Sequence, residues 1–246
     1  AFHTSFNICN VLILIWFIKP LEKLVCFIIS SKGGEEDDES RLTFIGGGLL
    51  STAELSILEA KKELNMFAER CLKMFRMVPE LLHTEKGDDF NKLFSRIEKY
   101  ENITDDMEVR IADYLNKVSE GRLSAESKTE IQHMLRQVSE LESIGDSCYN
   151  LARTINRKRN GNQDFTEKQY EHIHQMMQLT EDALAQMVAV VEDEDRVVDV
   201  NKTFNLENEM NNYRTELKNR NVVDVNNKQY DYQMGVHYMD LIGECE

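Results

Sequence analysis

The chain has 246 residues and a formal net charge of −15, with 44 Asp and Glu against 29 Lys and Arg. This acidity argues against nucleic-acid binding, because neutralising phosphates requires clustered Lys and Arg. Hydrophobic residues make up 41% of the chain, which excludes wholesale disorder. The chain contains only 2 prolines, which predicts long helices. Its 5 cysteines are scattered, without a CxxC motif, and favour neither a disulfide framework nor a zinc site.

Residues 1–30 are predicted to form a membrane segment. Residues 1–18 carry no Asp, Glu, Lys or Arg, as expected of the end of a membrane span. Three lysines follow: Lys19, Lys23 and Lys32. Because lysines next to a span favour a cytoplasmic location for the part that follows, we expect residues 31–246 to lie in the cytoplasm, at the inner or plasma membrane.

Residues 31–48 are predicted to be a flexible linker, because an acidic run lies between two glycine-rich stretches. The sequence begins at Ala1 rather than at a methionine, and it stops at Glu246 inside a helical pattern. We therefore expect it to be a fragment of a longer protein.

Six helices are predicted after the linker from apolar residues at helical spacing. Their expected ranges are 51–78 (ending at Pro79), 88–118, 124–158, 164–193, 194–220 and 227–246. Ser51 with Glu54 forms a capping-box pattern, and Ser124 and Thr166 are expected near the starts of the third and fourth helices. Short connections between long helices predict antiparallel neighbours in bundles.

Carboxylates interrupt the apolar stripes of the second and third predicted helices. Glu101 and Asp105 lie on the apolar side of the second, and Glu142 and Asp146 on that of the third. Both pairs read E-x-x-x-D, a spacing that places the two carboxylates on one face, a turn apart. Buried acids need a partner, and no Lys or Arg lies between them on these stripes, so we expect a metal ion. Gly145 would permit close approach of a neighbouring helix or of the ion.

Oxygen ligands of this kind suit a divalent or trivalent metal ion or ion cluster. The candidates are Fe, Mn and Mg, with Zn also compatible; the sequence does not choose between them.

The pattern recurs about a hundred residues later, which predicts a duplicated three-helix unit. Glu207 and Asn211 read E-x-x-x-N, and the run that ends at Glu246 resembles the run that ends at Glu142. These residues predict a second metal site formed by Glu207, Asn211 and Glu246. We expect it to be weaker, because Asn211 replaces an acid.

The predicted fold class is all-α. A transmembrane helix precedes two pseudo-repeated three-helix bundles, residues 49–160 and residues 161–246, and the second bundle is cut short.

The motif at Glu142 to Asp146, within SELESIGDSCYNLA, resembles the E-x-I-G-D signature of PhoU-family proteins. The stretch ENITDDMEVRIADYL, which contains Glu101 and Asp105, resembles that family's partner motif on the preceding helix. The resemblance covers about residues 51–246. It implies two PhoU-like three-helix bundles, each binding a metal cluster through its E-x-x-x-D motifs.

The stretch FHTSFN, residues 2–7, is followed by an apolar run and resembles the last transmembrane segment of Na/Pi-cotransporter family proteins. Many of these carry a C-terminal PhoU-like domain. The resemblance implies a cytoplasmic domain that modulates uptake by a sodium-dependent phosphate transporter. Its implied partners are the transport domain of the same protein, sodium, inorganic phosphate and the membrane, with a homodimer left open.

Two alternatives remain. Glu130 with His133 and Glu171 with His174 both read E-x-x-H, the spacing of ferritin-like di-metal carboxylate proteins. The Met-rich helices also fit a metal-free, membrane-anchored helical scaffold in which the acids are paired or solvated. The sequence contains no Gly-rich phosphate loop, no G-x-S-x-G motif and no recognisable Cys/His pair, so we expect no enzymatic activity.

Overall fold

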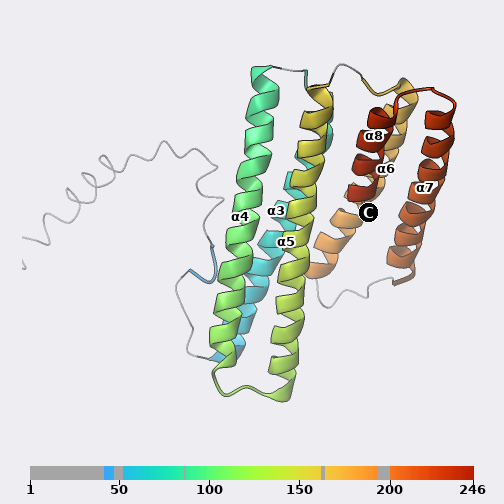
Figure 1. The fold of residues 1–246 in the computed structure, drawn as a ribbon. Helices are drawn as coiled ribbons and strands as arrows, with labels where there is room; N and C mark the ends of the chain where they lie inside the picture. Colours follow the sequence, from blue (N-terminus) through green and yellow to red (C-terminus); the bar gives the residue numbers. More distant parts are fainter. Residues whose placement is uncertain (1–41, 47–51, 86, 162–163, 193–199) are drawn as a thin grey trace, which may run out of the picture. The chain divides into compact units, whose positions relative to one another are not determined.

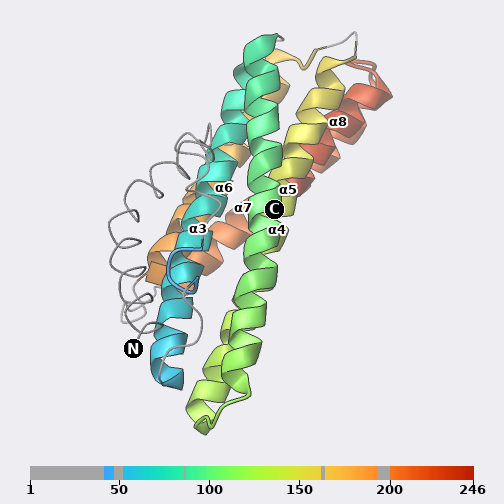
Figure 2. The same ribbon diagram turned by 90° about the vertical axis from the view of Figure 1, so that its left-hand side faces the viewer.

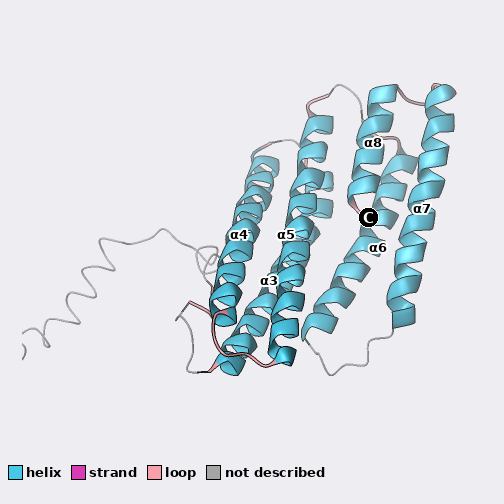
Figure 3. Ribbon diagram, turned by 60° about the horizontal axis from the view of Figure 1, so that its bottom comes forward, coloured by secondary structure: helices cyan, strands magenta, loops and turns pink. Residues whose placement is uncertain are grey.

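The structure is a computed structural model that describes residues 42–46, 52–85, 87–161, 164–192 and 200–246. These residues form six helices and contain no strand (Figures 1 and 3). The helices are α3 (Ala53–His83), α4 (Asp88–Ser119), α5 (Ala125–Arg159), α6 (Glu167–Glu192), α7 (Val200–Asn226) and α8 (Tyr232–Glu244). The predicted all-α class is therefore confirmed for this part of the chain. The predicted membrane segment, residues 1–30, lies outside it, and none of the six helices is apolar and long enough to span a bilayer.

The helices pack as two groups of three. α3, α4 and α5 all contact one another, and so do α6, α7 and α8. The groups are joined where α3 contacts α6 and where α5 contacts α8. Figure 2 shows α3 and α4 running side by side, with α6 and α8 behind them. Residues 42–246 thus form one unit with a shared apolar core.

Polar contacts reinforce the junction between the two groups. Arg76 Nε of α3 donates to Glu181 Oε1 of α6 at 2.7 Å. Asn150 of α5 donates to the Glu244 carboxylate of α8 at 3.1 Å. The buried Thr180 hydroxyl of α6 donates to the backbone carbonyl of Cys245 at 2.8 Å. Each of these bonds fixes the register of one helix against another.

The structure corrects the predicted end of the first helix. Pro79 lies inside α3, which continues to His83. Proline removes one backbone donor from a helix. However, Leu81 and Leu82 beyond it are 0% and 2% exposed, so burying them in the core outweighs that loss. The N-cap is Thr52, whose side chain accepts from the Leu55 amide, and the predicted cap residue Ser51 lies outside the described residues.

The other predicted caps are present. The Ser124 hydroxyl accepts from the Ser127 amide at 3.1 Å. Thr166 and Gln169 cap α6 reciprocally, each side chain accepting from the other's backbone amide.

The last two helices differ from their predicted ranges. α7 continues to Asn226 rather than to residue 220, and α8 begins at Tyr232 rather than at residue 227. A turn separates them, in which Lys228 takes a φ of 57°. Asp231 then caps α8 by accepting from the Met234 amide at 2.7 Å.

Of the predicted flexible linker, residues 31–48, only residues 42–46 belong to the described part of the chain. These residues contact α3 through Glu63, and Ile45 is only 5% exposed. The described cysteines, Cys71, Cys148 and Cys245, are buried free thiols. Burial raises the pKa of the Cys71 and Cys245 thiols to about 12, so they stay protonated and unreactive at neutral pH.

Candidate metal centre

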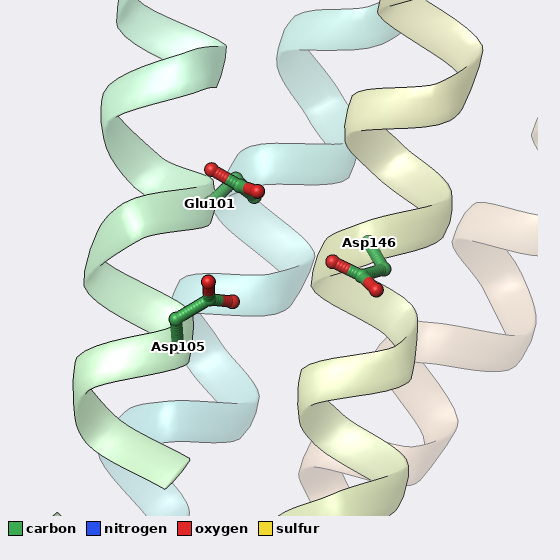
Figure 4. Close-up of side chains that lie close together, drawn as sticks. All are labelled: Glu101, Asp105 and Asp146. Carbon is green, nitrogen blue, oxygen red and sulfur yellow. The ribbon is translucent and has the colours of Figure 1, made fainter. Parts of the chain in front are cut away.

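Three of the predicted ligands meet in the gap between α4 and α5. Glu101 and Asp105 come from α4 and Asp146 comes from α5. One carboxylate oxygen from each lies within 4.8 Å of the other two. Figure 4 shows the two α4 carboxylates pointing toward α5 and the Asp146 carboxylate pointing toward α4. The three side chains therefore converge on one point, as a shared ion would require.

A close contact between Thr104 and Gly145 brings the acids together. A Cβ added at Gly145 would lie 2.6 Å from Thr104 Oγ1 and 3.1 Å from Thr104 Cβ, so a larger residue cannot fit without a shift. Thr104 is fully buried, and its hydroxyl donates to the Glu101 carbonyl at 2.7 Å. Because Asp105 follows Thr104 and Asp146 follows Gly145, this contact sets the distance between the two aspartates.

The acids flank the apolar stripes rather than occupying their middle. Asp105 and Asp146 are exposed, whereas Thr104 and Gly145 beside them are buried. The predicted interruption of the core by acid is therefore wrong in detail: the buried positions hold a threonine and a glycine, and the carboxylates lie at the edge. An edge position leaves room for water molecules to complete the coordination of an ion.

Glu142 is a neighbour of the cluster rather than a member of its compact group. It is half-buried on α5, one turn before Asp146. Its pKa is raised by burial and then by Asp146, Glu108 and Asp105. The carboxylates of the cluster therefore act on Glu142 as well, although its own carboxylate lies outside the compact group.

The cluster is electrostatically unbalanced. Burial raises the pKa of Glu101, and Asp105, Asp146 and further carboxylates raise it more. Burial and then Asp146 raise the pKa of Asp105. Within the described part of the chain, the charges that shift the pKa of these two groups are all carboxylates. An oxygen-only, strongly anionic set fits a hard cation and disfavours a soft one.

One acid that the sequence analysis did not single out, Glu98, extends this acidic surface. Glu98 lies one turn before Glu101 on α4, and its carboxylate accepts from the Tyr149 hydroxyl of α5 at 3.0 Å. Glu98 also contributes to raising the pKa of Glu101. In the sequence, the E-x-x-E spacing places Glu98 on the same side of the helix as Glu101. The hydrogen bond from Tyr149, which holds Glu98 between α4 and α5, is visible only in the structure.

The metal-free protein is expected to lose stability as the pH rises through the raised pKa of Glu101. Between the ordinary Glu pKa of 4.5 and the raised pKa of Glu101, the folded state binds more protons than the unfolded state, so the free energy of unfolding falls as the pH rises, and the loss is complete above the raised pKa. Glu101→Gln removes this group, so the stability of the variant relative to the unsubstituted protein should grow as the pH rises from the ordinary Glu pKa of 4.5 through the raised pKa of Glu101. Urea titrations in chelator measure the difference. A difference that stays constant with pH would contradict the repulsion.

The predicted second-site residues lie around a separate cleft of about 850 Å³ lined by α3, α5, α6 and α7. Glu207, Asn211 and Glu246 all line it. The Glu246 carboxylate forms an ion pair with Arg214, and Glu207 is exposed. Among the described residues, only Glu101, Asp105 and Asp146 form a group of three or more His, Cys, Asp or Glu side chains close enough to share a metal ion. The structure therefore places all three residues of the second set around one cleft, with the Glu246 carboxylate paired with Arg214.

The ferritin-like residues have other partners. Glu130 forms an ion pair with Lys61. His174 stacks on His83, with ring centroids 4.4 Å apart. In the described part of the chain the two E-x-x-H pairs do not form a common metal site.

Comparisons with known proteins agree with this arrangement. Residues 64–155 match the family model of the PhoU domain. The fold resembles the crystal structure of the phosphate transport system regulatory protein PhoU from Streptococcus pneumoniae, with a TM-score of 0.67 and 14% sequence identity. That match covers 79% of this chain and 88% of the other. A search of curated proteins finds no match. Residues 64–155, which include both E-x-x-x-D motifs, thus match the PhoU domain, and the described helices have a fold similar to that of a PhoU protein.

Proposed function

We propose that this chain is a metal-dependent regulatory domain of a phosphate transporter. One observation carries the proposal: Glu101, Asp105 and Asp146 converge at the Thr104–Gly145 contact within the residues that match the PhoU domain. The similar structure from Streptococcus pneumoniae is that of a phosphate transport system regulatory protein, which supports a role in phosphate transport.

In this proposal the three carboxylates hold the ion and Glu142 supports them. The bound ion, Fe, Mn, Zn or Mg, supplies the positive charge that these acids lack. Without it, Glu101 and Asp105 of α4 repel Asp146 of α5, and the two helices tend to separate at this level. The state of the centre would then set how α4 and α5 pack, and so which surface the domain presents.

The regulated transporter would be the sodium-dependent phosphate transporter implied by the sequence of residues 1–30. That segment has no Asp, Glu, Lys or Arg before Lys19, and it precedes the helical domain in the same chain. The helical domain would then lie on the cytoplasmic side and act on the transport part to which it is joined. It would act by binding and packing, without catalysing a reaction.

Phosphate uptake by cells that produce the natural protein tests this function. We expect Glu101→Gln with Asp146→Asn to raise uptake when phosphate is plentiful, because the domain can no longer restrain the transporter. Glu80→Gln, an exposed carboxylate on α3, is the matched control. Uptake of labelled phosphate is the measurement. If the double variant loses its metal but its phosphate uptake is unchanged, the regulatory role is refuted. The assignment of the metal site would still stand.

A further inference from the structure

A buried carboxylate on α3 binds the chain segment that precedes the helices. Glu63 lies in the third turn of α3 and is 0% exposed. A carboxylate without access to water needs strong hydrogen-bond donors. Its donors are three consecutive backbone amides: Thr43 N at 3.3 Å, Phe44 N at 2.7 Å and Ile45 N at 3.4 Å. Successive amides that converge on one anion form a strong and specific contact.

Apolar packing accompanies these bonds. Ile45 is buried in the core, and Leu42 packs against it. Lys62, the residue before Glu63, places its ammonium 5.5 Å from the centre of the Phe44 ring. Residues 42–46, which we call the strap, are therefore held both by burial and by charge-assisted hydrogen bonds.

The turn of α3 that holds the strap also contacts the second group of helices. The Asn65 side-chain amide lies against the Val191 carbonyl of α6, and with its nitrogen assigned to that side, as hydrogen bonding requires, it donates to this carbonyl at 3.0 Å. Leu64 lines the cleft between the two helix groups. On the other side, Lys61 pairs with Glu130 of α5. One helical turn thus touches the strap, α5 and the last turn of α6.

We propose that Glu63 is a latch that couples the strap to the seating of α6 on α3. When the strap is bound, its amides donate to the Glu63 carboxylate and hold this turn of α3 in position. Lys61 and Asn65 on the same turn then keep their contacts with α5 and α6. When the strap is pulled away, a buried carboxylate loses its donors and the turn must shift or admit water. A force on the chain before residue 42 is then transmitted to the junction of the two helix groups. The coupling itself does not depend on the proposed function; only its use in regulating a transporter does.

Hydrogen–deuterium exchange of the full chain tests the latch without metal or transport. In Glu63→Gln a side-chain NH₂ replaces one acceptor oxygen and opposes the strap amides. We expect residues 43–45 to exchange about tenfold faster or more, as the loss of charge-assisted bonds predicts. The end of α6, residues 187–192, should also exchange faster, while α4 keeps its protection. Glu80→Gln on the same helix is the control and should change neither segment.

Unchanged exchange at residues 43–45 in Glu63→Gln would overturn the latch. Faster exchange there without any change at residues 187–192 would overturn the coupling. If Glu63→Gln fails to fold by circular dichroism, Phe44→Pro carries the test, because it removes the shortest donor from the strap side and leaves α3 intact. Coupling is reciprocal, so Asn65→Ala must also speed exchange at residues 43–45. If residues 43–45 of Asn65→Ala exchange as slowly as in the unsubstituted protein, the proposed coupling is wrong.

Discussion

Adding a divalent metal ion to the purified chain at neutral pH is expected to raise its melting temperature by about 5–10 °C. An ion that binds only the folded state at a hundred times its dissociation constant adds about 2.7 kcal/mol to the free energy of unfolding. For a protein of this size, 1 kcal/mol shifts the melting temperature by roughly 2–4 °C. The physical source is relief of the repulsion among Glu101, Asp105 and Asp146, whose oxygens lie within 4.8 Å of one another. Calorimetry with and without chelator, combined with elemental analysis by mass spectrometry, measures both the shift and the bound ion.

Substitutions assign that shift to particular residues. Glu101→Gln with Asp146→Asn should abolish both the bound metal and the shift, while the helical content stays the same. Asp106→Asn is a close control, because Asp106 follows Asp105 but pairs with Arg110 along α4. Glu142→Gln with Asp146→Asn should also remove the metal, and Glu142→Gln alone shows whether Glu142 is a ligand or a neighbour. Equal metal content in the unsubstituted protein and the Glu101–Asp146 variant would disprove the site.

Gly145→Ala is expected to lower the free energy of unfolding by roughly 1–3 kcal/mol, as overpacking of a filled core does. Alanine favours a helix over glycine by about 1 kcal/mol, so intrinsic propensity acts in the opposite direction. The clash prevails because the new Cβ would lie 2.6 Å from Thr104 Oγ1, and that hydroxyl is fixed by its bond to the Glu101 carbonyl. Pushing α5 away from α4 would also separate Asp146 from Asp105, so metal affinity should fall together with stability. Urea denaturation and metal titration measure the two effects.

A double-mutant cycle isolates this contact. Thr104→Ala removes the hydroxyl and the methyl group that face Gly145, so Gly145→Ala should cost much less in that background. Gly243→Ala is the matched control, because a Cβ at Gly243 meets no atom within 4 Å and alanine there should be neutral or stabilising. An unchanged stability of Gly145→Ala would mean that the two helices can separate freely, and the argument that Gly145 sets the aspartate distance would then fail.

The sequence determined the presence of the helices and the common face of Glu101 and Asp105, because both depend on local spacing. Apolar residues at helical period define α3 to α6 closely, and Ser124 caps α5 as predicted. The E-x-x-x-D spacing places Glu101 and Asp105 on one face, whatever lies opposite. Burial in the core outweighed the tendency of proline to end a helix. α3 continues past Pro79 because Leu81 and Leu82 beyond it are buried in the core.

Only the tertiary structure decided which residues meet. It separates Glu142 from the compact cluster, pairs Glu246 with Arg214, and brings Asp146 to Asp105 through the Thr104–Gly145 contact. It also makes Glu63, a residue that the sequence analysis did not single out, a buried anchor for amides about 20 residues away in sequence. Helical periodicity reports which side of a helix faces inward. The partner of each side chain depends on the rotation and register of one helix against another, and the packing of the whole core sets these.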